Sequence, residues 1–141
     1  FKRGQACGIN NHLNYGYAIA RAAIARALVQ YGWLPALGLF HRNELNPFNL
    51  ADDFIEPYRP IVDLMVWHLH DQGRLKENLT PNAKQQLVAI LNQQICLDQQ
   101  TFSVLAAIDR TIASFQISLA DKNAKLLKLP GILPLKEHQY E

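Results

Sequence analysis

The chain has 141 residues, of which 49% are hydrophobic and 18% are charged, so it is able to bury the core of one compact domain. This composition excludes a disordered chain, and no window approaches the ~18 consecutive apolar residues of a membrane span. Cys7 and Cys96 lie far apart with no CxxC partner, which favours free thiols in a reducing cytoplasm over a disulfide scaffold or a zinc site. Because the chain begins with Phe1 and no signal pattern follows, we expect a piece of a longer cytoplasmic protein.

Charge is distributed unevenly along the chain. Residues 1–43 contain five basic residues and no acidic one, whereas residues 44–63 contain five acidic residues and a single basic one, Arg59. The remaining residues mix both signs, as solvated surfaces do. The candidate chemistry therefore lies where the basic stretch meets the acidic one.

Helices dominate the predicted secondary structure, because Ala and Leu together number 37 while Val, Ile and Thr together number 19. We expect an all-α fold, one domain over residues 1–141 with about four to six main helices and almost no sheet. The first helix is predicted to begin between Gly8 and Asn11 and to end at Gly32. Its many alanines allow close helix packing, which places it at the centre of the fold.

A loop is predicted for residues 33–47, since three residues that interrupt helices lie within it. These are Pro35, Gly38 and Pro47. Asn49 then offers an N-cap for a second helix. Two prolines within that helix predict a kink or a restart near Glu56, before an end near Gly73.

Two further helices are predicted in the second half of the chain. Thr80 followed by Pro81 is typical of a helix start, and apolar residues at helical spacing continue this third helix to Ile95. The fourth helix has the clearest periodicity, with apolar residues three and four apart that form one buried stripe. The stripe consists of Leu105, Ile108, Ile112, Phe115 and Leu119. An irregular segment is expected over residues 130–141.

A histidine and several carboxylates near the second helix are the candidate functional residues. Either Asp52 or Asp53 can share a helical face with Glu56, where two carboxylates could bind a divalent cation. His41 precedes this helix and could add an imidazole nitrogen, and such a donor set suits Mn²⁺ or Mg²⁺. A solvated acidic turn at a helix N-terminus and a histidine tucked under a loop explain the same pattern without any metal.

Three sequence blocks carry a specific resemblance. They are LNYGY at residues 13–17, GLFH at residues 38–41 and DxxEPxRP at residues 53–60. In this order and spacing they resemble the CRISPR adaptation integrase family, and most of all its type II-associated branch. The similarity covers essentially the whole chain. Since that family joins an N-terminal β-domain to a C-terminal α-helical catalytic domain, the resemblance implies that this chain is the catalytic domain without the β-domain.

The resemblance also implies an activity and a metal site. The family comprises metal-dependent DNA endonucleases and integrases, which insert short foreign DNA into a CRISPR array by attack of a 3′-hydroxyl on a phosphodiester. Relatives bind the metal through a glutamate, a histidine and a second acidic residue. Carried over, the histidine is His41 and the second acid is Glu56. The first glutamate has no counterpart, because residues 1–43 contain no acid, so the chain alone is expected to be inactive.

Charged neighbours receive supporting roles in this interpretation. Asp52 and Asp53 are expected to support the metal ligands from behind, and Arg59 either contacts phosphate or pairs with Asp63. Three arginines are candidates for contact with the DNA backbone, with simple solvation as the alternative. They are Arg21, Arg26 and Arg42.

The partners follow from the resemblance alone. They are DNA, as protospacer and CRISPR repeat, a second copy of the protein, and a small partner protein of the adaptation complex, all in the prokaryotic cytoplasm. The alternative function is a non-catalytic helical module that binds DNA or protein.

Overall fold

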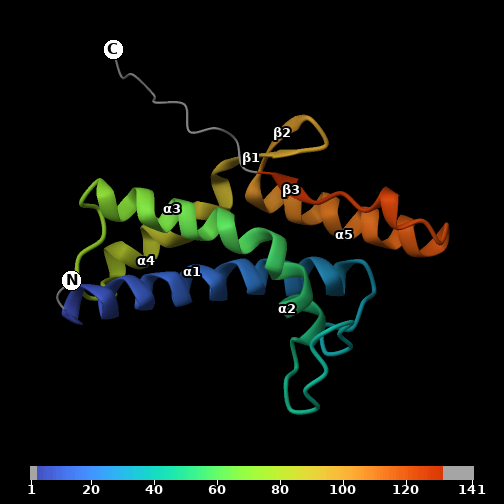
Figure 1. The fold of residues 1–141 in the computed structure, drawn as a ribbon, viewed down its shortest axis with the longest axis horizontal. Coiled ribbons are helices and arrows are strands. Elements are labelled where there is room, and N and C mark those ends of the chain that lie inside the picture. The colour runs from blue at the N-terminus through green and yellow to red at the C-terminus, as the bar shows by residue number, and fades with distance from the viewer. Residues whose placement is uncertain (1–2, 132–141) are drawn as a thin grey trace.

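The computed structural model describes the backbone of residues 3–131 and shows five α-helices with a small three-stranded sheet (Figure 1). The helices are α1 (Arg3–Gln30), α2 (Asn49–Ile55), α3 (Arg59–Asp71), α4 (Pro81–Val88) and α5 (Val104–Ala120). The predicted all-α class is confirmed. None of the helices in this described part is long and apolar enough to cross a membrane.

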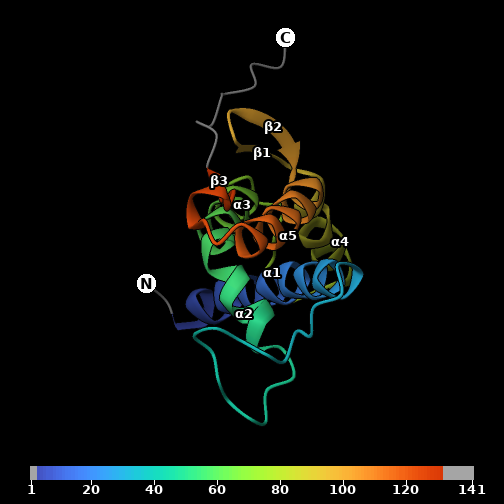
Figure 2. The same ribbon diagram turned by 90° about the vertical axis from the view of Figure 1, so that its right-hand side faces the viewer.

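Helix α1 runs through the fold and contacts each of the other four helices (Figures 1 and 2). The predicted central position is therefore confirmed, although the helix begins at Arg3 rather than between Gly8 and Asn11. Gly32 ends it as predicted, with a φ of 84° that glycine adopts without strain. Gly16 lets α3 approach closely, because a methyl group at this position would lie only 2.9 Å from Cγ1 of Val62.

The chain changes direction between α2 and α3. The turn is a short 3₁₀ segment, η1 (Glu56–Tyr58), and prolines 57 and 60 lie at the starts of η1 and α3. Both prolines lack the N–H that a continuous helix would need, so the predicted kink near Glu56 is confirmed. Helix α3 ends at Asp71, close to the predicted Gly73.

The segment after α4 differs from the prediction. Thr80 caps α4 as expected, accepting a hydrogen bond from the Ala83 amide at 3.1 Å. The helix does not reach Ile95, however, because the chain passes through η2 (Ala89–Asn92) into the strand β1 (Gln94–Leu97). Ile95 and Leu97 are buried while residue 94 is exposed, which is the two-residue period of a strand.

Strand β1 is the middle strand of the sheet. It pairs antiparallel with β2 (Gln100–Ser103), placing Ile95 opposite Phe102, and with β3 (Pro130–Gly131). Pro130 and Gly131 are thus ordered as a strand, where an irregular segment was expected. The rest of that expectation, residues 132–141, lies outside the described residues.

Helix α5 buries a stripe that is rotated from the predicted one. Its three central apolar residues are buried as expected, but Leu105 and Leu119 are each 48% exposed. The buried face instead includes hydroxyl residues whose hydrogen bonds are satisfied internally: Ser114 and Ser118 donate to the carbonyls of Thr111 and Phe115. Such local bonding lets small polar side chains replace apolar ones in the core.

Candidate active site

His41 lies in a long, largely exposed loop that connects α1 to α2. Asn49 is the first residue of α2 and not its N-cap, so that prediction is wrong. The residue is 4% exposed and holds the loop, because its Nδ2 donates to the carbonyls of Ala36 at 3.0 Å and Asn43 at 2.7 Å. The helix start itself has no side-chain cap. Gly38 is required here, since a Cβ atom would lie 2.1 Å from the carbonyl oxygen of His41 and 2.8 Å from Cβ of Asn49.

Asp53 of α2 organises the turn that carries His41. Its side chain is only 6% exposed, and its oxygens accept hydrogen bonds from three consecutive backbone amides, at 2.5 Å from Leu39, 3.2 Å from Phe40 and 3.0 Å from His41. The same carboxylate lies 2.7 Å from Nδ1 of the His41 ring. The loop and the imidazole are therefore both positioned by one carboxylate.

The hydrogen bonds of Asp53 also fix its charge. Burial alone would raise its pKa, but the bonds from the amide and ring of His41, together with those from Leu39 and Phe40, outweigh burial and lower the pKa. An ionised carboxylate only accepts hydrogen bonds, so Nδ1 of His41 must be the donor. When the ring is neutral, it presents the lone pair of Nε2 to any ligand, on a side chain that is 43% exposed.

Glu56 follows one turn after Asp53 and has a different environment. Its side chain is 55% exposed and pairs with Nε of Arg59 at 3.1 Å. The guanidinium of Arg59 also lies 4.9 Å from the ring centre of Tyr17 in α1. Tyr17 in turn donates its hydroxyl to Asp63. Arg59 therefore pairs with Glu56, and the alternative of an ion pair with Asp63 is wrong.

Burial also affects the ionisation of Tyr17. Desolvation, then the hydrogen bond and the negative charge of Asp63, raise the pKa of this phenol from 10.0 to about 12, against a smaller opposing effect of Arg59. The neutral hydroxyl is accordingly the form that the native contacts favour.

The loop is tied to α1 by Arg21. Its Nε lies 3.1 Å from Oδ1 of Asp52, its Nη2 donates to Asn46 at 3.1 Å, and its guanidinium lies 4.3 Å from the ring centre of Phe48. Asn46 also donates to Asp52 at 2.6 Å. Arg21 and Asp52 thus have a structural role in holding the loop. Support of a metal ligand by Asp52, and DNA contact by Arg21, stay predictions.

The other two arginines predicted to contact DNA, Arg26 and Arg42, are exposed on the surface. Arg26 is exposed on α1, and Arg42 is exposed on the His41 turn, where its Nε donates to the carbonyl of Leu39 at 3.1 Å. Both residues are exposed, and DNA contact by Arg26 and Arg42 stays a prediction.

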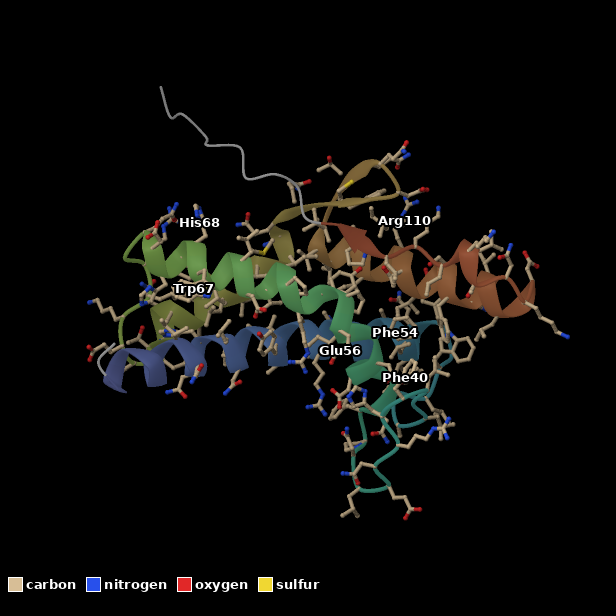
Figure 3. The ribbon with its side chains drawn as sticks, in the orientation of Figure 1. Phe40, Phe54, Glu56, Trp67, His68 and Arg110 are labelled. Carbon is tan, nitrogen blue, oxygen red and sulfur yellow. The ribbon has the colours of Figure 1, made fainter. Side chains whose placement is uncertain are left out.

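The predicted ligands lie in different segments, His41 in the loop before α2 and Glu56 in η1 after it. His41 contacts the carboxylate of Asp53 directly, whereas Glu56 lies three residues beyond Asp53 along the chain. Figure 3 shows Phe40 and Glu56 on either side of α2. Trp67 and His68 on α3, and Arg110 on α5, lie further from α2 in the same view. Across the residues that the structure describes, no three His, Cys, Asp or Glu side chains form a ready metal cage. One nitrogen and one carboxylate donor suit part of a Mn²⁺ or Mg²⁺ shell.

Sequence comparison decides the family. The sequence model described as CRISPR associated protein Cas1 matches residues 2–96. The chain belongs to the Cas1 family. The resemblance found in the three sequence blocks is therefore confirmed.

Individual Cas1 relatives extend this result. The chain is 64% identical over 141 residues to the CRISPR-associated endonuclease Cas1 of Neisseria meningitidis serogroup C (strain 8013), covering all of this chain and 46% of that protein. It is 32% identical over 94 residues to the CRISPR-associated endonuclease Cas1 1 of Francisella tularensis subsp. novicida (strain U112), covering 66% of this chain and 30% of that one. The chain thus spans less than half the length of these relatives.

A solved structure shares the fold. A casposase bound to integration product superposes with a TM-score of 0.71 at 25% identity, over 82% of this chain and 38% of that chain. The fold of this chain is therefore shared with this casposase over most of the chain's length.

Proposed function

We propose that the chain is the catalytic portion of a CRISPR-associated DNA endonuclease and integrase that inserts short foreign DNA into a CRISPR array. The observation that carries the proposal is the contact between Asp53 and His41, in which a buried carboxylate orients one exposed imidazole. A histidine that only fills a loop needs no such partner, whereas a metal-binding histidine usually has one. The names of the relatives, endonuclease and casposase, support the same activity.

His41 Nε2 and the Glu56 carboxylate would hold the Mn²⁺ or Mg²⁺ ion. When bound, such an ion polarises a phosphodiester and activates a water or a 3′-hydroxyl for in-line attack. Asp53 accepts the Nδ1 proton of His41, which leaves the lone pair of Nε2 to bind the metal ion. Arg59 lies beside Glu56 and is placed to pair with phosphate once this carboxylate turns to a cation.

The remaining parts of the proposal rest on family membership. The third ligand would be the family glutamate that has no counterpart here, so the full-length protein would be active and the chain alone inactive. DNA is the proposed substrate, as protospacer and CRISPR repeat. A homodimer and a small partner protein of the adaptation complex complete the proposed assembly, in the prokaryotic cytoplasm.

The test compares three variants of the full-length protein in Mn²⁺-dependent DNA cleavage. His41→Ala should abolish cleavage. Asp53→Asn should weaken the apparent Mn²⁺ affinity about 10- to 100-fold, because outer partners of metal-binding histidines have effects of this size. His68→Ala is the matched control, since this histidine is exposed on α3 and its ring bonds to the neighbouring Gln72 at 2.8 Å. Cleavage by His41→Ala at the rate of the unmodified protein would refute the proposed role.

One observation favours the alternative, a non-catalytic helical module. Residues 1–43 contain no acidic residue to match the first glutamate of the family's metal site. Calorimetry of the 141-residue chain with Mn²⁺ separates the two functions. Binding that disappears in His41→Ala supports the catalytic proposal, and binding that is unchanged in this variant supports the alternative.

A further inference from the structure

Phe40 is the most exposed aromatic residue of the candidate site. Phe40 is 90% exposed, although burying an aromatic ring is more favourable in free energy than burying most other side chains. The exposure is not the result of a loose backbone. The amide of Phe40 donates to Asp53 at 3.2 Å, and the amides on either side of it bond to the same carboxylate. The ring is thus displayed from a fixed turn.

The neighbours of Phe40 define what the turn can bind. The next two residues are His41 and Arg42, both exposed, and Nε of Arg42 bonds back to the carbonyl of Leu39 at 3.1 Å. The carboxylate that binds this turn, Asp53, is turned inward and only 6% exposed, whereas Glu44 is exposed further along the same loop. The exposed surface therefore combines an aromatic ring, an imidazole and a cation, which complement a base and its phosphate.

We propose that Phe40 is a stacking platform for one unpaired DNA base next to the phosphodiester that His41 engages. The proposal rests on the function proposed above, from which it takes DNA as the substrate. Consecutive Cα atoms are about 3.8 Å apart, so the base contact and the phosphate contact arise from adjacent points of the turn. A base inside a duplex has both faces stacked on its neighbours, so only a single-stranded or extruded base can use the ring.

A protein partner is the competing occupant of this loop. The loop also exposes Leu34, Leu37 and Leu45, at 64%, 68% and 91%. A protein docking on an apolar surface would use these leucines as well, and any apolar side chain at position 40 would serve it. The exposed cation of Arg42, two residues from the Phe40 ring, favours the nucleic acid.

The experiment measures binding of the 141-residue chain to a short thymidine single strand that carries one 2-aminopurine, a fluorescent base. EDTA is present, so binding does not depend on a metal. Phe40→Ala and Phe40→Leu should each weaken binding about tenfold, as expected when one base–aromatic stack is removed. Phe40→Trp should restore the affinity and quench the 2-aminopurine fluorescence. Leu45→Ala is the matched control and should bind like the unmodified chain, since it is equally exposed on the same loop.

Each other outcome contradicts the proposal. Equal binding by all Phe40 variants would show that the ring does not contact DNA. Full binding by Phe40→Leu, or equal losses in Phe40→Ala and Leu45→Ala, would indicate a general apolar contact of the kind that a protein uses. Loss of stacking in Phe40→Ala is independent of the His41-dependent cleavage test, so failure of the base contact with intact cleavage leaves the proposed function standing.

Discussion

Tyr17 links two helices at the edge of the candidate site through one half-buried hydroxyl. It bonds to Asp63 of α3 and supports, on its ring, the same Arg59 that pairs with Glu56. Its pKa of about 12 in the native chain exceeds the ordinary 10.0. A group whose pKa is raised by folding stabilises the native state below its unfolded pKa, and this contribution is lost as pH rises through the folded pKa.

We therefore expect the stability that Tyr17 contributes to decline between pH 10 and about 12. Difference absorbance between the native chain and Tyr17→Phe should show one phenol ionising near pH 12. Replacing Asp63 by Asn should move this ionisation toward 10, because the negative charge disappears and the amide oxygen accepts a weaker hydrogen bond than the carboxylate. A Tyr17 phenol that ionises near pH 10 in the unmodified chain would contradict the assignment.

The sequence predicts candidate residues for the site but does not predict their arrangement. The family blocks pointed to His41 and Glu56, because each block is a short run of neighbouring residues that can be recognised in the sequence. The central role of Asp53 could not be read in the same way. Its bonds to the turn join residues 12 to 14 positions apart, and they form only when the loop folds back on α2.

The loop of residues 33–48 is the element that delivers His41, and Gly38 is its tightest point. A Cβ atom at Gly38 would lie 2.1 Å from a backbone oxygen, so neither side can yield cheaply. The GLFH block thus has a steric reason for its glycine, apart from the histidine that ends it.

Gly38→Ala should lower the free energy of unfolding by about 1–3 kcal/mol, the usual cost of overpacking. It should also speed hydrogen exchange at the amides of residues 39–41, since the loop must open to admit the methyl group. Urea unfolding and exchange measured by NMR provide the two readouts. Gly131→Ala is the control, because its nearest neighbour lies 3.9 Å away and little change is expected. Equal effects at the two positions would contradict the steric account.

Elements determined by local signals were predicted well. The end of α1 at Gly32, the proline kink near Glu56 and the Thr80 cap all depend on residues a few positions apart. Strand β1 was mistaken for helix, since a short apolar run fits both periods. Its strand conformation depends on pairing with β2, across a two-residue turn, and with β3, which is remote in sequence.

At the scale of the whole molecule, Tyr58 joins the candidate site to the far helix. It is 1% exposed at the turn between α2 and α3, and its hydroxyl lies 2.8 Å from Oγ1 of Thr111 in α5. Thr111 is equally buried. This contact crosses the core, so the position of the α2 end depends on the packing of α5.

Tyr58→Phe should destabilise the chain by about 1–3 kcal/mol, because Thr111 loses the partner of a buried hydroxyl. Tyr31→Phe removes a similar bond, to Asp109 at 3.1 Å, from a half-buried position and should cost less, since water can replace it. Urea unfolding of the two variants measures both losses. A larger loss in Tyr31→Phe would show that burial does not control the cost.

The β1–β2 hairpin offers the chain a means of compensation. Its two turn residues, Asp98 and Gln99, have φ values of 52° and 61°, a region that costs residues other than glycine about 1 kcal/mol each. The hairpin lies on the side of the fold away from the His41 loop in both ribbon views (Figures 1 and 2). Glycine at either turn position would therefore raise the free energy of unfolding, and this gain would offset the destabilisation caused by substitutions near the His41 loop.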